Sequence, residues 1–256
     1  MKNSLKKLFE TKSKNLISIY FSAGYPVLNS TTTIINQLSK SGIDFIEVGI
    51  PYSDPLADGP IIQESGSIAL ENGMNLKLLF KQLDSIKNTN STPLIMMGYW
   101  NSILQFGVEK FLESCHKTNI SGAILPDLPI EIYKKKYKNL FKKYKIPLIF
   151  LITPQTTEDR IRKIDSLSNS FIYAVSSSST TGKKTGIEGS KEYLKRLKGF
   201  QLNSPLITGF NIKNKKDFKF ACQYTQGVVI GSAFINSIKG KESLEKNIEN
   251  FVSEFN

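Results

Sequence analysis

Short apolar runs rich in β-branched residues recur along the chain, and a polar stretch with apolar residues near helical spacing follows each of them. The predicted strands are Leu16–Phe21, Ile43–Ile50, Leu94–Tyr99, Gly122–Leu125, Pro147–Ile152, Phe171–Val175, Pro205–Thr208 and Gly227–Ile230. The predicted helices are Thr31–Ser41, Leu76–Lys87, Val108–Lys117, Ile130–Lys143, Thr157–Leu167, Ser190–Leu197, Asn214–Tyr224 and Glu242–Phe255. Near-continuous apolar strands suit a parallel sheet that is buried on both faces.

Eight strand–helix units in 256 residues predict an α/β protein of the (β/α)8 TIM barrel type. No Pro/Gly/Ser-rich linker divides the sequence, so we expect residues 1–256 to form a single barrel domain. Lys2–Lys12 is expected to form an extra N-terminal helix across the barrel floor. The structural alternative is a doubly wound open sheet, but the segment Ser22–Pro26 after the first strand is not a dinucleotide-binding fingerprint.

Composition indicates a globular chain, with 40% hydrophobic and 22% charged residues. No apolar run is long enough to span a bilayer, and the first ten residues lack the apolar segment of a secretory signal. We therefore expect a cytoplasmic protein without membrane association. Cys115 and Cys222 are not spaced as a metal motif, and we expect both to be free thiols.

The formal net charge of +12 is compatible with a nucleic-acid partner, an anionic substrate or a lysine-rich surface. The basic residues are mostly lysines scattered over predicted helices, and no nucleic-acid-binding module is recognisable. Solvated helix faces are the favoured interpretation, so we expect no nucleic-acid partner. A basic, non-catalytic nucleic-acid or scaffold protein is the alternative from another class.

The segment Ile46–Pro60 concentrates the candidate chemistry. Glu47 lies inside an apolar strand, and the Pro/Gly-rich loop that follows carries Asp54 and Asp58. An unpaired buried carboxylate is costly and tends to take up a proton. At the mouth of a barrel, a partly dry environment would raise the pKa of Glu47 toward the operating pH, which suits proton transfer. The alternative is a structural glutamate held by a lysine or by backbone amides.

Asp58 has three possible roles in this loop. It could take part in the chemistry, cap the helix that Pro60 would begin, or bind a divalent cation with its neighbours. A metal site is the poorest of these, and we expect none. His116, the only histidine, lies in the middle of a predicted helix, where a structural or exposed imidazole is expected. Acid–base work therefore falls to carboxylates, tyrosines or lysines.

Two late turns have the chemistry of a phosphate site. Thr208–Ile212 follows the seventh predicted strand, and Ile230–Phe234 follows the eighth and opens a short helical stretch. In many barrels these two loops bind phosphate through backbone amides. Gly209, Gly231 and Ser232 suit that role, although ordinary turns or helix caps are the alternative.

The polar loop Ser176–Gly189 follows the sixth predicted strand. It could close over a substrate as a lid, or it could be an idle connection. Thr181 and Gly182 near its start could add donors to the same phosphate.

The segment Glu47–Gln63 resembles the signature of the tryptophan synthase α chain family. The likeness covers nearly the whole chain and includes Tyr20, Pro93 to Asn101, Pro126–Pro129, Tyr173, Thr181–Gly182, Gly209–Phe210 and Gly231–Ser232. The resemblance implies a lyase that cleaves indole-3-glycerol phosphate to indole and glyceraldehyde 3-phosphate by a retro-aldol reaction. It implies no metal and no organic cofactor.

The resemblance also implies roles for individual residues. Glu47 matches the acid–base group that transfers protons, Asp58 matches the aspartate that contacts the indole ring nitrogen, and Tyr173 matches a tyrosine beside the site. Positions that match the indole pocket are Tyr20, Met97, Tyr99, Leu125, Leu151 and Phe210. Positions expected at the phosphate are Thr181, Gly182, Asn211, Gly231 and Ser232.

The chain departs from the family pattern at two places. Asn211 stands where most relatives have a glycine, which puts the affinity for the phosphate in question. Ser177 and Ser179 stand where relatives usually begin the lid with arginine and glycine, so lid closure is expected to be tuned differently.

Family members pair with a pyridoxal-phosphate β chain in an αββα assembly, and the loop around Asp54 and Pro55 would meet that partner. Alternative enzymes are an indole-glycerol-phosphate synthase or a phosphoribosylanthranilate isomerase. These should present a catalytic lysine or cysteine at strand ends, where this chain has Glu47, Asp127 and Tyr173. A free-standing indole-releasing relative would share the same residues.

Overall fold

Eight parallel strands close into a barrel in the computed structural model, which describes residues 4–175, 190–209, 212–240 and 242–255. The strands are β1 (Leu16–Ser22), β2 (Phe45–Gly49), β3 (Leu94–Met97), β4 (Ile120–Ile124), β5 (Leu148–Ile152), β6 (Ile172–Val175), β7 (Leu206–Gly209) and β8 (Gly227–Ile230). They follow one another in chain order, and β8 pairs with β1 to close the ring. The predicted (β/α)8 barrel is confirmed.

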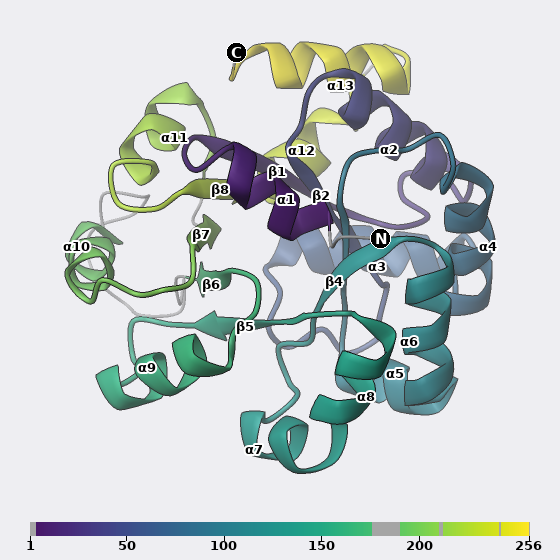
Figure 1. The fold of residues 1–256 in the computed structure, drawn as a ribbon. Coiled ribbons are helices and arrows are strands. Elements are labelled where there is room, and N and C mark those ends of the chain that lie inside the picture. The colour runs from purple at the N-terminus through teal and green to yellow at the C-terminus, as the bar shows by residue number, and fades with distance from the viewer. Residues whose placement is uncertain (1–3, 176–189, 210–211, 241, 256) are drawn as a thin grey trace.

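Helices surround the barrel (Figure 1). They are α1 (Ser4–Thr11), α2 (Ser30–Lys40), α3 (Pro60–Glu71), α4 (Leu76–Ile86), α5 (Trp100–Phe106), α6 (Val108–Lys117), α7 (Ile130–Ile132), α8 (Lys138–Tyr144), α9 (Glu158–Leu167), α10 (Lys191–Gly199), α11 (Lys215–Ala221), α12 (Ser232–Ser237) and α13 (Leu244–Ser253). Apolar residues recur at helical spacing in most of them and face the sheet.

The N-terminal helix α1 lies across the near end of the barrel in Figure 1. Its Phe9 ring lies 5.7 Å from the ring of Phe171, which in turn lies 5.5 Å from the ring of Phe45. This aromatic row fills the floor, as expected for an extra N-terminal helix. The strands therefore open for chemistry only at their C-terminal ends.

The hydrophobic pattern did not reveal α3 or α5. The buried residues of α3 are Ser65, Gly66 and Ala69, which are too small or too polar to produce an apolar stripe. The short helix α5 buries only Ile103. The single helix predicted at Ile130–Lys143 is instead α7, a π-helical turn η1 (Tyr133–Tyr137) and α8.

Two glycines make room for two tyrosines inside the barrel. Tyr20 pairs with Glu47 across the β1–β2 ladder, and both side chains are buried. A Cβ atom at Gly49 would overlap the hydroxyl of Tyr20, and one at Gly209 would overlap the hydroxyl of Tyr173. Glycine is therefore required where each tyrosine crosses the neighbouring strand.

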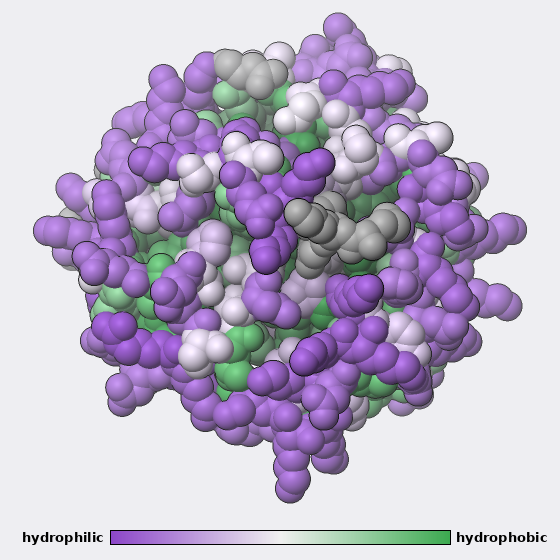
Figure 2. Space-filling view, in the orientation of Figure 1, coloured by the Kyte–Doolittle hydropathy of each residue, from purple (hydrophilic) through white to green (hydrophobic). Residues whose placement is uncertain are grey.

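The face shown in Figure 2 is largely hydrophilic, with hydrophobic residues showing in small patches between polar ones. This surface agrees with lysines spread over solvated helix faces. In the part of the chain that is described, no helix has both the length and the apolar character needed to cross a membrane.

Candidate active site

Glu47 lies in the middle of β2, and its side chain is 0% exposed. Neither carboxyl oxygen has a hydrogen-bond partner among the described residues. Burial raises the pKa of Glu47 from 4.5 to about 8, so the carboxyl can take or release a proton near neutral pH. The alternative of a structural glutamate is not supported, because no described lysine or backbone amide holds the Glu47 carboxyl.

Asp58 lies in the loop after β2 and is held by a tyrosine. The Tyr99 hydroxyl donates to Asp58 Oδ2 at 3.0 Å and accepts from the Ala57 backbone N–H at 2.9 Å. Gly59, not Asp58, is the N-cap of α3, so the capping alternative is wrong. Burial raises the pKa of the Asp58 carboxyl, and the Tyr99 hydrogen bond opposes that rise.

The loop that carries Asp58 is supported from two sides. The Gln63 side-chain amide donates to the backbone carbonyls of Asp58, at 2.9 Å, and Pro55, at 3.3 Å. On the other side, the ring of Tyr52 stacks on that of Tyr99 with 5.1 Å between centroids. The Asp58 carboxylate is therefore preorganised rather than mobile. Sequence reasoning missed Tyr52, whose ring contact joins segments distant in sequence, and Gln63, whose local hydrogen bonds to the loop carbonyls leave no hydrophobic pattern.

Tyr20 on β1 and Tyr173 on β6 are buried inside the barrel, as Glu47 is. Burial is the main cause that raises the pKa of both hydroxyls, and the negative charges of Glu47 and Asp58 add to it. Both tyrosines therefore stay protonated at physiological pH. Tyr20 also lines a small cavity at the barrel mouth, whose other walls are Ile50, Asp58, Met97, Gly98, Tyr99 and Pro126.

Some of the remaining predicted site residues lie within the described part of the chain, and the others lie outside it. Leu125 is buried directly after β4, and Leu151 is half-buried on β5. Gly231 is the N-cap of α12, which Ser232 begins, and a Cβ at Gly231 would contact Tyr20 at 3.5 Å. The turn after β8 therefore lies beside Tyr20. Outside the described residues lie Thr181, Gly182, Phe210 and Asn211, with the loop Ser176–Gly189.

The other residues that were considered for chemistry, His116 and Asp127, lie in structural or exposed positions. His116 is exposed as expected, but it lies in the last turn of α6 rather than in the middle of the helix. Asp127 accepts a hydrogen bond from the Trp100 backbone N–H at 2.8 Å and so supports the start of α5. Among the described residues, no group of three or more His, Cys, Asp or Glu side chains could hold a metal ion.

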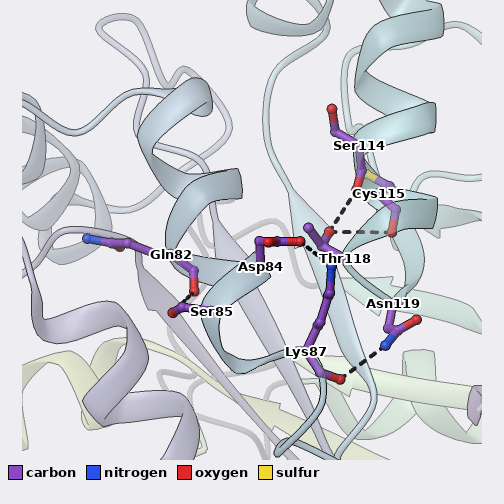
Figure 3. Close-up of polar contacts among 8 residues, drawn as sticks. All are labelled: Gln82, Asp84, Ser85, Lys87, Ser114, Cys115, Thr118 and Asn119. Carbon is purple, nitrogen blue, oxygen red and sulfur yellow. Dashed lines mark hydrogen bonds and ion pairs between the residues drawn. The ribbon is translucent and has the colours of Figure 1, made fainter.

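A larger cavity of about 920 Å³ lies at the opposite end of the barrel. The basic residues of its lining are Lys6, Lys87, His116, Lys117, Lys142 and Lys145, and the lining contains no carboxylate. Figure 3 shows how the ends of α4 and α6 are completed there: Lys87 pairs with Asp84, Asn119 donates to the Lys87 carbonyl, and Thr118 donates to the Ser114 carbonyl. Lysines at helix C-termini complement the helix dipoles. This cavity offers no acid–base pair.

The raised pKa of Glu47 predicts a pH-dependent stability. Between pH 4.5 and about 8, the unfolded chain binds fewer protons than the folded chain, so the free energy of unfolding should fall as pH rises. The limiting slope for one proton is about 1.4 kcal/mol per pH unit. Glu47→Gln should flatten this part of the profile, as measured by denaturant unfolding at pH 5, 6, 7 and 8. Equal slopes in the two proteins would contradict the assignment.

A closed (β/α)8 barrel with a buried carboxyl on β2 and a second carboxylate in the following loop is the arrangement of an enzyme that transfers protons with carboxyl groups. The chain belongs to the tryptophan synthase alpha chain family, whose model matches residues 5–256. Members of this family are carbon–carbon lyases of tryptophan biosynthesis.

Known members of the family match this chain over almost its full length. The tryptophan synthase alpha chain of Flavobacterium psychrophilum is 54% identical over 244 residues, which cover 95% of this chain and 96% of the relative. That of Karelsulcia muelleri is 49% identical and covers 98% of both chains. The crystal structure of the alpha chain from Legionella pneumophila subsp. pneumophila has a TM-score of 0.88 and 29% identity, covering 100% of this chain and 96% of the other.

Proposed function

We propose that this chain cleaves indole-3-glycerol phosphate to indole and glyceraldehyde 3-phosphate by a retro-aldol reaction. The observation that carries the proposal is Glu47, a buried carboxyl with a pKa raised to about 8 in the strand that leads to Asp58. Family membership supplies the substrate class. The proposal is tested by measuring indole release from this substrate with the purified chain.

Each carboxyl has a distinct task in the proposed reaction. Cleavage of the bond to indole C3 requires that C3 gains a proton and that the side-chain hydroxyl loses one, so no net proton is consumed. Glu47 can carry out such transfers because both of its protonation states are accessible near neutral pH. Asp58, ionised and held by Tyr99, stabilises the positive charge that develops at the ring nitrogen. Tyr173 is proposed to lie beside the reacting atoms.

The substrate contacts are proposed from the matched positions. The indole ring would lie among Tyr20, Met97, Tyr99, Leu125, Leu151 and Phe210. The phosphate would lie at Thr181, Gly182, Asn211, Gly231 and Ser232. The N-cap position of Gly231 supports this placement, because the first amides of a helix are free to bind an anion. Neither a metal nor an organic cofactor is proposed.

The proposed partner is a tryptophan synthase β chain in an αββα heterotetramer, which would receive indole and hold the pyridoxal phosphate. The loop after β2 supports this proposal, because Leu56 at its tip is 94% exposed and Asp54 and Pro55 adjoin it. A held loop with an apolar side chain at its tip could bury that side chain against a partner at little cost in loop ordering. Cytoplasmic location and the absence of nucleic-acid and membrane partners are part of the same proposal.

Leu56→Ser should reduce the rise in lyase rate that a cognate β chain produces, while leaving the rate of the isolated chain unchanged. The substitution removes apolar contact area from the loop tip and costs the fold little, because Leu56 is exposed. Leu70→Ser, at a half-exposed leucine on α3, is the control. Full stimulation of the Leu56→Ser variant would place the β chain elsewhere.

The neighbouring barrel enzymes fit less well. An indole-glycerol-phosphate synthase or a phosphoribosylanthranilate isomerase would need a lysine or cysteine at the strand ends, and none of the eight described strands contains either residue. Cys115 is buried in α6. A free-standing indole-releasing enzyme differs only in its response to a β chain, which the Leu56 experiment measures.

A further inference from the structure

Ser18 is a second polar group inside the barrel without a described partner. It lies on β1, its side chain is 0% exposed, and its hydroxyl oxygen has no hydrogen bond among the described residues. Ser18 alternates with Ile19 and so shares the interior face with Tyr20. A buried hydroxyl without a partner costs about 1–3 kcal/mol, so native proteins rarely leave one unsatisfied.

Glu47, on the neighbouring strand β2, is another buried group without a described partner. Ser18 pairs with Phe45 on β2, two residues before Glu47, and both Glu47 oxygens also lack a described partner. Strand spacing and rise put the Cα atoms of Ser18 and Glu47 about 8 Å apart. By strand alternation both side chains face the barrel interior, and no direct hydrogen bond joins them. A single bridging water that makes one hydrogen bond to each group can join two oxygen atoms up to about 5.5 Å apart.

We propose that one buried water molecule bridges the Ser18 hydroxyl and the Glu47 carboxyl, and that Ser18 is thereby a positioning residue for Glu47. Water and hydroxyl can each donate and accept. When Glu47 is protonated, its O–H donates to the water. When Glu47 is ionised, the water donates to the carboxylate and accepts from Ser18. The bridge therefore serves both states that an acid–base group must visit, which is the only point that rests on the proposed function.

The charges around Glu47 make such a donor important. The other titratable groups that act on this interior are Tyr20 on β1, Tyr173 on β6, Asp58 in the loop after β2 and Tyr99 after β3. None of these groups is a cation, so none of them stabilises the ionised form of Glu47 as a positive charge would. A hydrogen-bonded water lowers the cost of ionisation without adding a charge.

The test measures the pKa of Glu47 in the substrate-free protein from its carboxyl infrared band, assigned by subtracting the spectrum of Glu47→Gln. Ser18→Val removes the hydroxyl and fills the space of the water. The pKa should rise by about one pH unit in this variant, because a hydrogen bond to a charged group is lost. Ser18→Thr keeps a hydroxyl and should retain the wild-type value.

Ser170→Ala is the matched control, since the hydroxyl of Ser170 is also buried without a described partner but lies just before β6, at the floor. It should leave the pKa of Glu47 unchanged. If Ser18→Val does not fold, Ser18→Ala gives the same comparison with a smaller rise. An unchanged pKa after loss of the Ser18 hydroxyl, or equal shifts in the Val and Thr variants, would overturn the bridge. Because no substrate is present, a failure of the proposed lyase reaction would not alter this result.

Discussion

Glu47→Gln is expected to lower the turnover of indole-3-glycerol phosphate by roughly 10²–10⁴-fold, the usual contribution of a general acid–base group. The amide matches the carboxyl in size and cannot transfer a proton. The fold should persist, because Glu47 makes no hydrogen bond to the described residues that the substitution would break. Indole release measures the effect, and circular dichroism with thermal unfolding checks the fold.

Glu71→Gln is the matched control for this variant. Glu71 is an exposed glutamate at the end of α3, so the same chemical change there should leave turnover intact. A Glu47→Gln protein that is folded and turns over substrate near the wild-type rate would show that another group moves the proton.

Asp58→Asn is expected to lower turnover by roughly 10²–10³-fold, as for the loss of one preorganised electrostatic contact. Asparagine can still accept the hydrogen bond from Tyr99, so the loop should keep its shape. What is lost is the negative charge proposed to face the indole ring nitrogen. Steady-state kinetics of the isolated chain should show the loss mainly in kcat, because the charge on the ring develops only in the transition state.

Asp54→Asn is the control for Asp58, since Asp54 is an exposed aspartate four residues earlier in the same loop. Its only described side-chain contact is with the hydroxyl of Ser53. Without a β chain present, this variant should keep the wild-type rate. Equal losses in the two variants would assign the effect to the loop rather than to the Asp58 charge.

The barrel was predictable because its strands are apolar on both faces and its longer helices carry apolar stripes. The helices that the pattern did not reveal, α3 and α5, bury mainly small residues or a single one, so their sequences lack that signal. The segment from α7 to α8 was predicted as one helix because Ile130, Tyr133, Tyr137 and Phe141 keep helical spacing across the π-helical turn. The fold and the family are thus accessible from the sequence, and helix boundaries are less so.

The candidate site was predictable only in part. Glu47 and Asp58 are close in sequence, and strand alternation places Glu47 inside. The hydrogen bond from Tyr99 to Asp58 joins residues 41 positions apart. The need for glycine at position 49 arises because the Tyr20 ring on the neighbouring strand passes over that position. Such contacts follow from barrel closure, which no local pattern encodes. The roles of the site residues and the single-domain boundary 1–256 stay predictions.

The most direct measurement supplies indole-3-glycerol phosphate to the purified chain and quantifies both products. We expect indole and glyceraldehyde 3-phosphate to be released in equal amounts, at a rate that a cognate β chain raises and that Glu47→Gln nearly abolishes. Failure to release indole with or without the β chain, or release of one product without the other, would contradict the proposed reaction.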